Sequence, residues 1–243
     1  MLPPFEGGAG MQHNPSLAEY MKRMVKMAHM DMEYVCSQMV YLCIQPRKVY
    51  QLTAYRKQTK NQWARDDPAF VVILVLFQLA TSIAYGVALQ VSFGTILRMM
   101  MAFAGLQFAL FGIIFATIGW HVSNTYMRVQ SMHGTEQLTE WLFCFDIHCN
   151  SFFPFFLVTY VLQFFLLPFI LHAGFFASLL SNIIYLFGVV YYCYLTSLGY
   201  ATLPFLSKSE IFLYPALGYA VLAIVFVLAS VNPTHLWLYF TGV

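Results

Sequence analysis

Charged side chains are scarce in this chain. Lysine, arginine, aspartate and glutamate make up 9% of the 243 residues, whereas apolar residues make up 60%. Soluble globular domains carry about a quarter charged residues. The composition therefore excludes a soluble globular protein and indicates an integral membrane protein, and the length leaves room for one domain.

No cleavable signal peptide is expected. The first ten residues, MLPPFEGGAG, contain neither a positively charged segment nor an apolar one. We therefore expect the first transmembrane helix to direct insertion. The five cysteines are an odd number and fall in segments predicted to be cytosolic or within the membrane, so no disulfide framework is expected.

Catalytic and metal-binding motifs are equally sparse. The segment FDIHCN brings Asp146 and His148 close to Cys144, but the spacing matches no standard zinc motif. His148 and Asn150 could be read as the histidine–asparagine pair of a membrane-embedded acyltransferase, yet no second catalytic group accompanies them. The sequence predicts a protein that is not an enzyme and has no cofactor or metal, with this segment in a structural role at a membrane boundary.

Long apolar runs are the main feature that is present. An α-helix needs about 20 apolar residues to cross the hydrocarbon core. The sequence predicts an all-α, polytopic membrane protein with five transmembrane helices at residues 69–90, 99–120, 152–171, 176–198 and 211–231.

Helix-terminating residues support several of these ends. Asn150 or Ser151 is expected to cap the third helix, and Pro168 predicts a kink within it. Residues 207–210, Ser-Lys-Ser-Glu, fit a capping box for the fifth helix. Pro215 could move that start by one turn.

Four further segments lie outside the predicted spans. They are a disordered N-terminus (1–15), a cytosolic basic amphipathic helical head (16–68), a polar cytosolic loop with a short amphipathic helix from Thr135 (121–150), and a lumenal C-terminus (232–243). Within the head, residues 16–30 have the apolar spacing of an interfacial helix. Residues 32–44 are too few for a span and are better suited to a helix on the cytosolic leaflet, ended by Pro46.

The distribution of basic residues predicts the orientation. Nine of the twelve lysines and arginines precede residue 68. Arg128 and Lys208 would lie on the same side of the membrane as the head, leaving Arg98 alone on the other side. The positive-inside rule therefore places the head in the cytosol.

The segment from Tyr55 to Phe70, YRKQTKNQWARDDPAF, joins the basic head to the first span, and we call it the seam. Asp66 or Asp67 can cap the first helix, and Pro68 suits its first turn. The basic and aromatic residues of the seam either signal topology alone or also contact anionic lipids or a partner. The candidate residues are Arg56, Lys57, Lys60, Trp63, Arg65, Asp66 and Asp67, with Asp146, His148 and Asn150 as a facing patch. RNA binding is a weaker alternative, because no nucleic-acid module surrounds the basic run.

Polar residues within the predicted spans are few. They are Gln78, Gln107, Gln163 and Asn182, with no Asp, Glu or Lys at mid-membrane. This pattern argues against an ion-coupled transporter and favours amides that hold helices together. The alternative is a lipid scramblase or small-molecule transporter with a polar groove lined by Gln107, Gln163 and Asn182.

Four segments together resemble the Unc-fifty family of Golgi multi-pass membrane proteins. They are the seam, the upstream MDMEYVCSQMVYLCIQPRKVY, the segment FDIHCNSFFP and the later YLTSLGYATLPFL, in the family's order and spacing from about Tyr20 to Tyr214. The resemblance implies five transmembrane helices, a cytosolic N-terminus and a Golgi location, with the endoplasmic reticulum and inner nuclear membrane as further locations.

The same resemblance implies a role in vesicular protein trafficking. Family members are linked to recruitment of an exchange factor for Arf GTPases, to surface delivery of nicotinic acetylcholine receptors as cargo, and in some animals to RNA binding. It supplies no catalytic residue for this chain.

Overall fold

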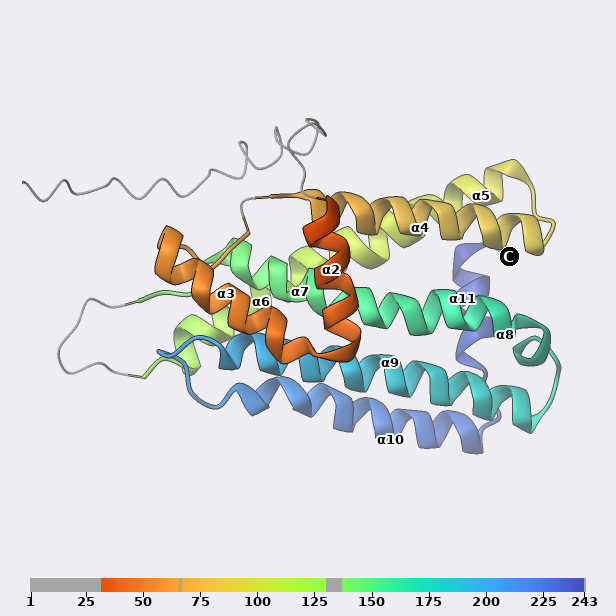
Figure 1. Cartoon of the computed structure of the whole chain (residues 1–243). Coiled ribbons are helices and arrows are strands. Elements are labelled where there is room, and N and C mark those ends of the chain that lie inside the picture. Colours follow the sequence, from red (N-terminus) through yellow and green to blue (C-terminus); the bar gives the residue numbers. More distant parts are fainter. Residues whose placement is uncertain (1–31, 66, 130–136, 243) are drawn as a thin grey trace, which may run out of the picture.

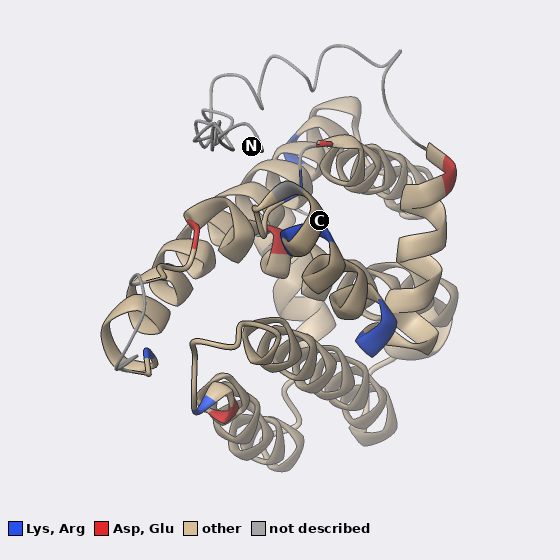
Figure 2. Ribbon diagram, turned by 60° about the vertical axis from the view of Figure 1, so that its left-hand side comes forward, with Lys and Arg blue, Asp and Glu red and all other residues tan. Residues whose placement is uncertain are grey.

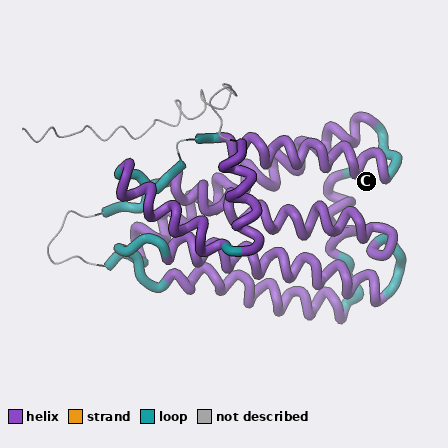
Figure 3. The backbone as a smooth tube through the Cα atoms, in the orientation of Figure 1, coloured by secondary structure: helices purple, strands orange, loops and turns teal. Residues whose placement is uncertain are grey.

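The computed structural model describes residues 32–65, 67–129 and 137–242. Over these residues the chain is helical, and its β-structure is limited to one isolated bridge between Arg128 and Leu206. The all-α prediction is therefore confirmed (Figure 3). The disordered segment predicted for residues 1–15 and the interfacial helix predicted for residues 16–30 lie outside the described residues.

Five helices are long and apolar enough to cross a membrane, as predicted. Two of them are continuous runs that contain a π-helical segment. The spans comprise α4 (Ala69–Ala88); α5 (Phe93–Met100), η2 (Met101–Leu110) and α6 (Phe111–Tyr126); α7 (Trp141–Phe156), η3 (Leu157–Leu162) and α8 (Gln163–Ile170); α9 (Phe175–Ala201); and η4 (Ser209–Leu213) with α10 (Tyr214–Leu228). Figure 1 shows them as a bundle of roughly aligned helices.

The second and third spans are longer than predicted. The second begins at Phe93, where the Ser92 hydroxyl accepts from the Thr95 N–H at 3.3 Å. The third begins at Trp141 rather than near residue 152, so Asn150 and Ser151 lie inside a helix and do not cap it. The predicted bounds of the loop, 121–150, were wrong at both ends. The helices continue through its polar residues, because these residues find hydrogen-bond partners within the protein.

The extra length projects from one end of the bundle. Spans of 34 and 30 residues measure about 51 and 45 Å at roughly 1.5 Å per residue, whereas the hydrocarbon core is about 30 Å thick. The 20 residues of α4 match that thickness. The last turns of α6 and the first turns of α7 therefore extend past the start of α4 (Figure 1).

A helical hairpin, α2 (Met32–Ile44) and α3 (Pro46–Lys60), packs beside these projecting turns. We call this end of the bundle, where the hairpin packs, the hairpin end. The helix predicted at 32–44 is present with those bounds, and Pro46 both follows it and begins α3. The hairpin is attached to α9, because the Tyr191 hydroxyl donates to the Leu42 carbonyl at 2.9 Å and the Tyr50 hydroxyl donates to the Leu195 carbonyl at 3.0 Å.

The fifth span starts differently from the prediction. The capping box at 207–210 is not formed: Lys208 has a left-handed backbone with φ of 62°, and a 3₁₀ turn follows it. The α-helix begins one turn later with Pro215 in its first turn, which is the shift that Pro215 suggested. Pro168 lies inside α8, and the π-helical segment of this span follows Pro154 instead.

A short helix that was not predicted, α11 (Pro233–Thr241), lies at the end opposite the hairpin. The Asn232 side chain caps it by accepting from the Thr234 N–H at 3.0 Å. Trp237 projects from α11 into an aromatic cluster with Tyr85 and Phe103, at ring-centroid distances of 5.3 and 4.9 Å. This helix therefore packs as part of the bundle.

Candidate functional site

The seam includes the last residues of α3 and the connection to α4, and its residues 62–65 are buried. Asn61 ends α3 in the left-handed conformation with φ of 55°. The Glu140 carboxylate, just before α7, then accepts hydrogen bonds from the backbone N–H groups of Trp63 at 3.3 Å and Ala64 at 3.2 Å. Residues in a non-helical segment cannot pair their N–H groups within a helix, so Glu140 supplies the acceptors that these buried N–H groups would otherwise lack.

Arg65 and Asp146 form a buried ion pair at the centre of the seam. The guanidinium Nε lies 3.4 Å from Asp146 Oδ1, and both side chains are less than one-tenth exposed. The Arg65 backbone N–H also donates to Asp146 Oδ2 at 2.6 Å. One carboxylate on α7 thus binds both the backbone and the side chain of the same seam residue.

The remaining donors of Arg65 are also used. Its guanidinium donates to Asn150 Oδ1 at 2.5 Å and to Gln38 Oε1 at 3.2 Å. Its face lies over the Phe70 ring at 4.2 Å. A buried charge is tolerated when it is paired and hydrogen-bonded in this way. The network ties α2, the seam and α7 together, which is a structural role.

Trp63 belongs to the interior rather than to an exposed surface. Its ring packs against Phe143 and Phe205, with centroids at 6.0 and 6.4 Å. The Lys57 ammonium lies 5.7 Å from the same ring and donates to the Asn61 carbonyl at 2.8 Å. Lys57 therefore helps to close the C-terminal end of α3.

Two of the exposed basic residues lie on the outer face of α3, which we call the α3 surface. Arg47 and Lys48 are exposed in its first turn, Tyr55 is 64% exposed near its middle, and Arg56 is half-buried. No acidic residue occurs in α3. The inner face is fixed by Tyr50, whose pKa is raised by burial and lowered to a smaller degree by Asn150 and Arg65, so the phenol stays neutral.

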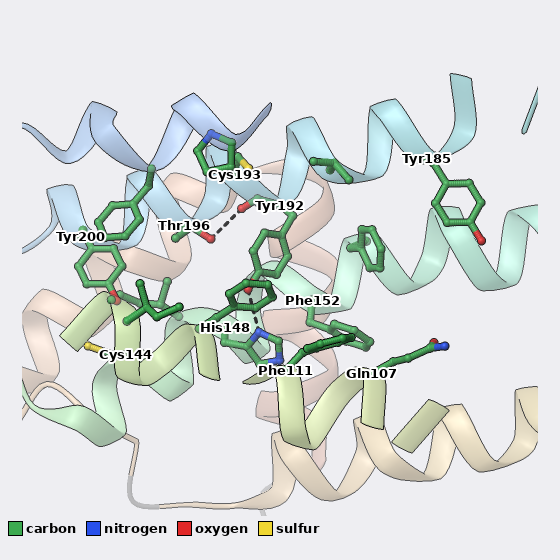
Figure 4. Close-up of a pocket in the computed structure, with 18 of the residues that line it drawn as sticks. Gln107, Phe111, Cys144, His148, Phe152, Tyr185, Tyr192, Cys193, Thr196 and Tyr200 are labelled. Atoms are coloured by element: carbon green, nitrogen blue, oxygen red, sulfur yellow. Dashed lines mark hydrogen bonds between the residues drawn. The ribbon is translucent and has the colours of Figure 1, made fainter. Parts of the chain in front are cut away.

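His148 lies in the interior of α7, two residues before Asn150. Its Nδ1 shares a hydrogen bond of 2.8 Å with the Tyr192 hydroxyl of α9, and its ring stacks on Phe108 at 5.6 Å. Gly112 makes this approach to α6 possible, because a Cβ there would lie 2.7 Å from the imidazole. The histidine thus connects three spans (Figure 4).

Beside His148 is a cavity of about 670 Å³ between α6, α7 and α9. Gln107 lines it, but Gln163 and Asn182 do not. Asn182 instead donates to the carbonyls of Ser178 at 2.8 Å and Val231 at 3.0 Å, which holds α9 to the segment before α11. The groove predicted to be lined by all three amides is therefore not formed.

The structure separates the predicted site residues into two groups. Arg65, Asp146 and Asn150 are brought together and buried, whereas Arg56 lies on the α3 surface. The facing patch expected from Asp146, His148 and Asn150 is therefore not a surface. The helix continues through these residues, and partners on α2, the seam and α9 take up their polar groups.

Asp66 or Asp67 was predicted to bind the free backbone N–H groups at the start of the first span, and Asp67 does so. Asp67 Oδ1 accepts from the Ala69 N–H at 2.9 Å at the start of α4. Asp67 therefore pairs one free donor of this helix as predicted, although Pro68, expected in the first turn, itself occupies the N-cap position. Asp66 lies outside the described residues, as does the side chain of Lys60.

Sequence reasoning did not single out three residues that complete this arrangement. They are Gln38, Glu140 and Tyr192, which contact Arg65, the seam backbone and His148. Gln38 gave one usable signal, since it is one of the few polar residues in a mostly apolar 13-residue helix. The described residues contain no group of three His, Cys, Asp or Glu side chains that could hold a metal ion.

The fold and this arrangement define a five-span α-helical membrane protein with a helical hairpin locked to one end by buried polar groups. Sequence comparison narrows the class. The UNC-50 family model matches residues 20–241, and the chain belongs to the UNC-50 family. The resemblance carried by the seam is thereby confirmed.

Named relatives cover most of the chain. It is 48% identical over 201 residues to the protein unc-50 homolog of Dictyostelium discoideum, covering 82% of this chain and 77% of the relative. It is 37% identical over 198 residues to the human homolog, covering 81% and 76%. It is 40% identical over 206 residues to protein unc-50 of Caenorhabditis elegans, covering 82% and 65%. No solved structure matches.

Proposed function

We propose that this chain is a non-enzymatic adaptor of Golgi and early secretory membranes. In this role it helps to recruit an exchange factor for Arf GTPases and supports surface delivery of receptors such as nicotinic acetylcholine receptors. The hairpin end faces the cytosol in this proposal, and the segment after α10 faces the lumen. Family membership motivates the pathway, and the α3 surface provides the docking element.

The observation that carries the proposal is the basic, exposed face of α3. Arg47 and Lys48 are free of acidic neighbours on their own helix, and Lys48 Nζ lies 3.9 Å from the Tyr41 ring centroid. Each basic residue close to an anionic leaflet contributes about 1 kcal/mol to membrane adhesion. The same charges complement an acidic surface on a protein partner.

Rigidity is the second support. The inner side of α3 is held by Tyr50, and the segment after α3 is held by Glu140 and Arg65. A surface fixed in this way loses little conformational freedom on binding, which favours affinity. Charged residues elsewhere on the described helices are few, as Figure 2 shows.

Charge reversal of the α3 surface tests the proposal. Arg47→Glu with Lys48→Glu places acids in the first turn of a helix, where they complement the helix dipole, so folding is preserved. Recruitment of the Arf exchange factor to membranes carrying the full chain should fall at least tenfold. A second variant reverses Arg56, Lys57 and Lys60.

Lys208→Glu provides the matched control, because Lys208 is an exposed base at the hairpin end outside α3. It should leave recruitment unchanged. Vesicles with and without anionic lipid separate a lipid contact from a protein contact. If the charge-reversed variant is also defective on neutral vesicles, the α3 surface contacts the exchange factor itself; if it is defective only on anionic vesicles, the α3 surface acts through the lipid. Normal recruitment by both charge-reversed variants in folded form would overturn the proposal.

The other candidate functions have less support. A scramblase needs a path for charged headgroups, but the described residues around the large cavity include no Asp, Glu, Lys or Arg. RNA binding would use the same α3 surface, where Tyr55 is the exposed aromatic residue, without a recognised nucleic-acid module.

A further inference from the structure

The large cavity lies within the part of the chain that spans the membrane. Its volume of about 670 Å³ is within the range of small-molecule sites, roughly 300–1,000 Å³. Aromatic residues make up half of its lining, including Phe115, Phe152 and Tyr192. Flat, rigid walls of this kind favour a ligand that is itself apolar and rigid.

The cavity opens toward lipid along α6. Phe111, Phe115 and Ile118 all line it, and each remains 43–52% exposed. These residues lie in the second span, which is long and apolar enough to cross a membrane. A ligand can therefore enter from the bilayer without crossing water.

The lining is mainly apolar but includes several hydrogen-bonding side chains, among them Gln107, Thr196 and Tyr192. The Tyr192 hydroxyl is bonded to His148 Nδ1, and both side chains line the cavity (Figure 4). A tyrosine hydroxyl can donate once and also accept, so this bond leaves capacity for one more partner. A ligand with one hydroxyl at this depth would use that capacity.

We propose that the cavity binds a sterol, meaning a rigid fused-ring lipid with one hydroxyl, and that the Tyr192 hydroxyl is its hydrogen-bond partner. The described residues that line the cavity include no Lys or Arg, so a phosphate or carboxylate group would have no counter-ion there. The ligand is therefore expected to be uncharged. Rigidity favours a sterol over an acyl chain, because a flexible chain loses more conformational freedom on binding. This inference does not depend on the trafficking proposal.

Photolabelling of the full chain in phosphatidylcholine nanodiscs tests the site. The probe is a sterol that carries a diazirine and keeps its hydroxyl, and mass spectrometry locates the label. We expect saturable labelling of cavity-lining peptides of α6, α7 and α9. Excess unlabelled sterol should compete, and excess diacylglycerol should not.

A pair of adjacent valines supplies the matched variants. Val189 lines the cavity, whereas Val190 is 44% exposed on the outer side of α9. Val189→Trp should abolish saturable labelling and Val190→Trp should retain it. Tyr192→Phe should weaken sterol binding about three- to tenfold, the size of one hydrogen bond. If Val189→Trp does not fold, Tyr192→Phe carries the test, since it removes a single oxygen.

Two kinds of result would contradict the sterol site. Labelling confined to outward-facing residues, or unchanged in folded Val189→Trp and Tyr192→Phe, would overturn the site. Equal competition by diacylglycerol would overturn the sterol assignment.

Discussion

Arg65 and Asp146 are 81 residues apart in the sequence and form an ion pair in which both side chains are less than one-tenth exposed. One lies just before the first span and the other in the second turn of α7. The pair therefore fixes the hairpin end of the bundle at the level where α4 begins. Because the surrounding polar groups complete the hydrogen bonding of Arg65, the pair acts as a lock rather than as a reactive site.

Removal of one charge should expose the cost of burying the other. Asp146→Asn keeps the shape of the side chain but leaves the Arg65 guanidinium without a counter-ion. We expect a loss of about 3–5 kcal/mol in the free energy of unfolding. Denaturant titration of the purified chain in detergent measures it.

A double variant separates pairing from burial. Arg65→Met combined with Asp146→Leu removes both charges, and its loss should be smaller than the sum of the two single losses. Glu210→Gln, at an exposed position, should change stability by less than about 0.5 kcal/mol. An unaltered midpoint for Asp146→Asn would show that the pair contributes little.

Glu140 should control the order of the seam backbone. Its two carboxylate oxygens accept from Trp63 and Ala64, and Glu140→Gln leaves a single acceptor oxygen. The change should cost about 1–3 kcal/mol if one donor is left unpaired. Hydrogen exchange at residues 62–65 should accelerate, while Glu33→Gln on the exposed side of α2 should have no such effect. Unchanged exchange in Glu140→Gln would mean that water replaces the lost acceptor.

Local sequence patterns predicted the five spans and the contact of Asp67 with the start of α4. Long apolar runs have a length set by the bilayer, and Asp67 accepts a hydrogen bond from a backbone N–H two residues away, so both depend on neighbouring residues only. The helix at 32–44 was predicted from the same kind of information.

Long-range partners decide the features that were predicted wrongly. Asp146, His148 and Asn150 look like loop residues because polar groups inside a span are costly. They become helical and buried because Arg65 and Tyr192 supply their hydrogen bonds. Nothing in the local sequence identifies these partners, which lie on other elements. The same reason explains why α11 was missed, since the partly buried Trp237 packs against Tyr85 and Phe103 of other spans.

Gly119 should be intolerant of any side chain. A Cβ built at this position would overlap the Tyr200 hydroxyl, and the next atom, Cζ, would lie 3.0 Å away. Gly119→Ala should therefore destabilise the contact between α6 and α9 by about 1–3 kcal/mol. Denaturant titration should show that Tyr200→Phe, which removes the overlapping oxygen, restores part of the loss.

A second glycine provides the comparison. Gly218 lies in α10, and a Cβ there would meet nothing within 4 Å. Gly218→Ala should be neutral or stabilising by up to about 1 kcal/mol, because alanine is the better helix former. Equal losses at both glycines would show that backbone effects rather than the Tyr200 contact set the cost.

Trp237 should anchor α11 to the bundle through two separable contributions. Its ring packs 5.5 Å from Tyr160, and its Nε1 donates to Gln107 Oε1 at 3.3 Å. Trp237→Phe keeps an aromatic ring and should cost about 1 kcal/mol for the hydrogen bond, whereas Trp237→Ala should cost about 3–5 kcal/mol. Limited proteolysis should release the C-terminus of the alanine variant first. Tyr239→Ala removes a ring that is 76% exposed on the same helix and should leave proteolysis unchanged, so equal release from both would show that α11 is not anchored by Trp237.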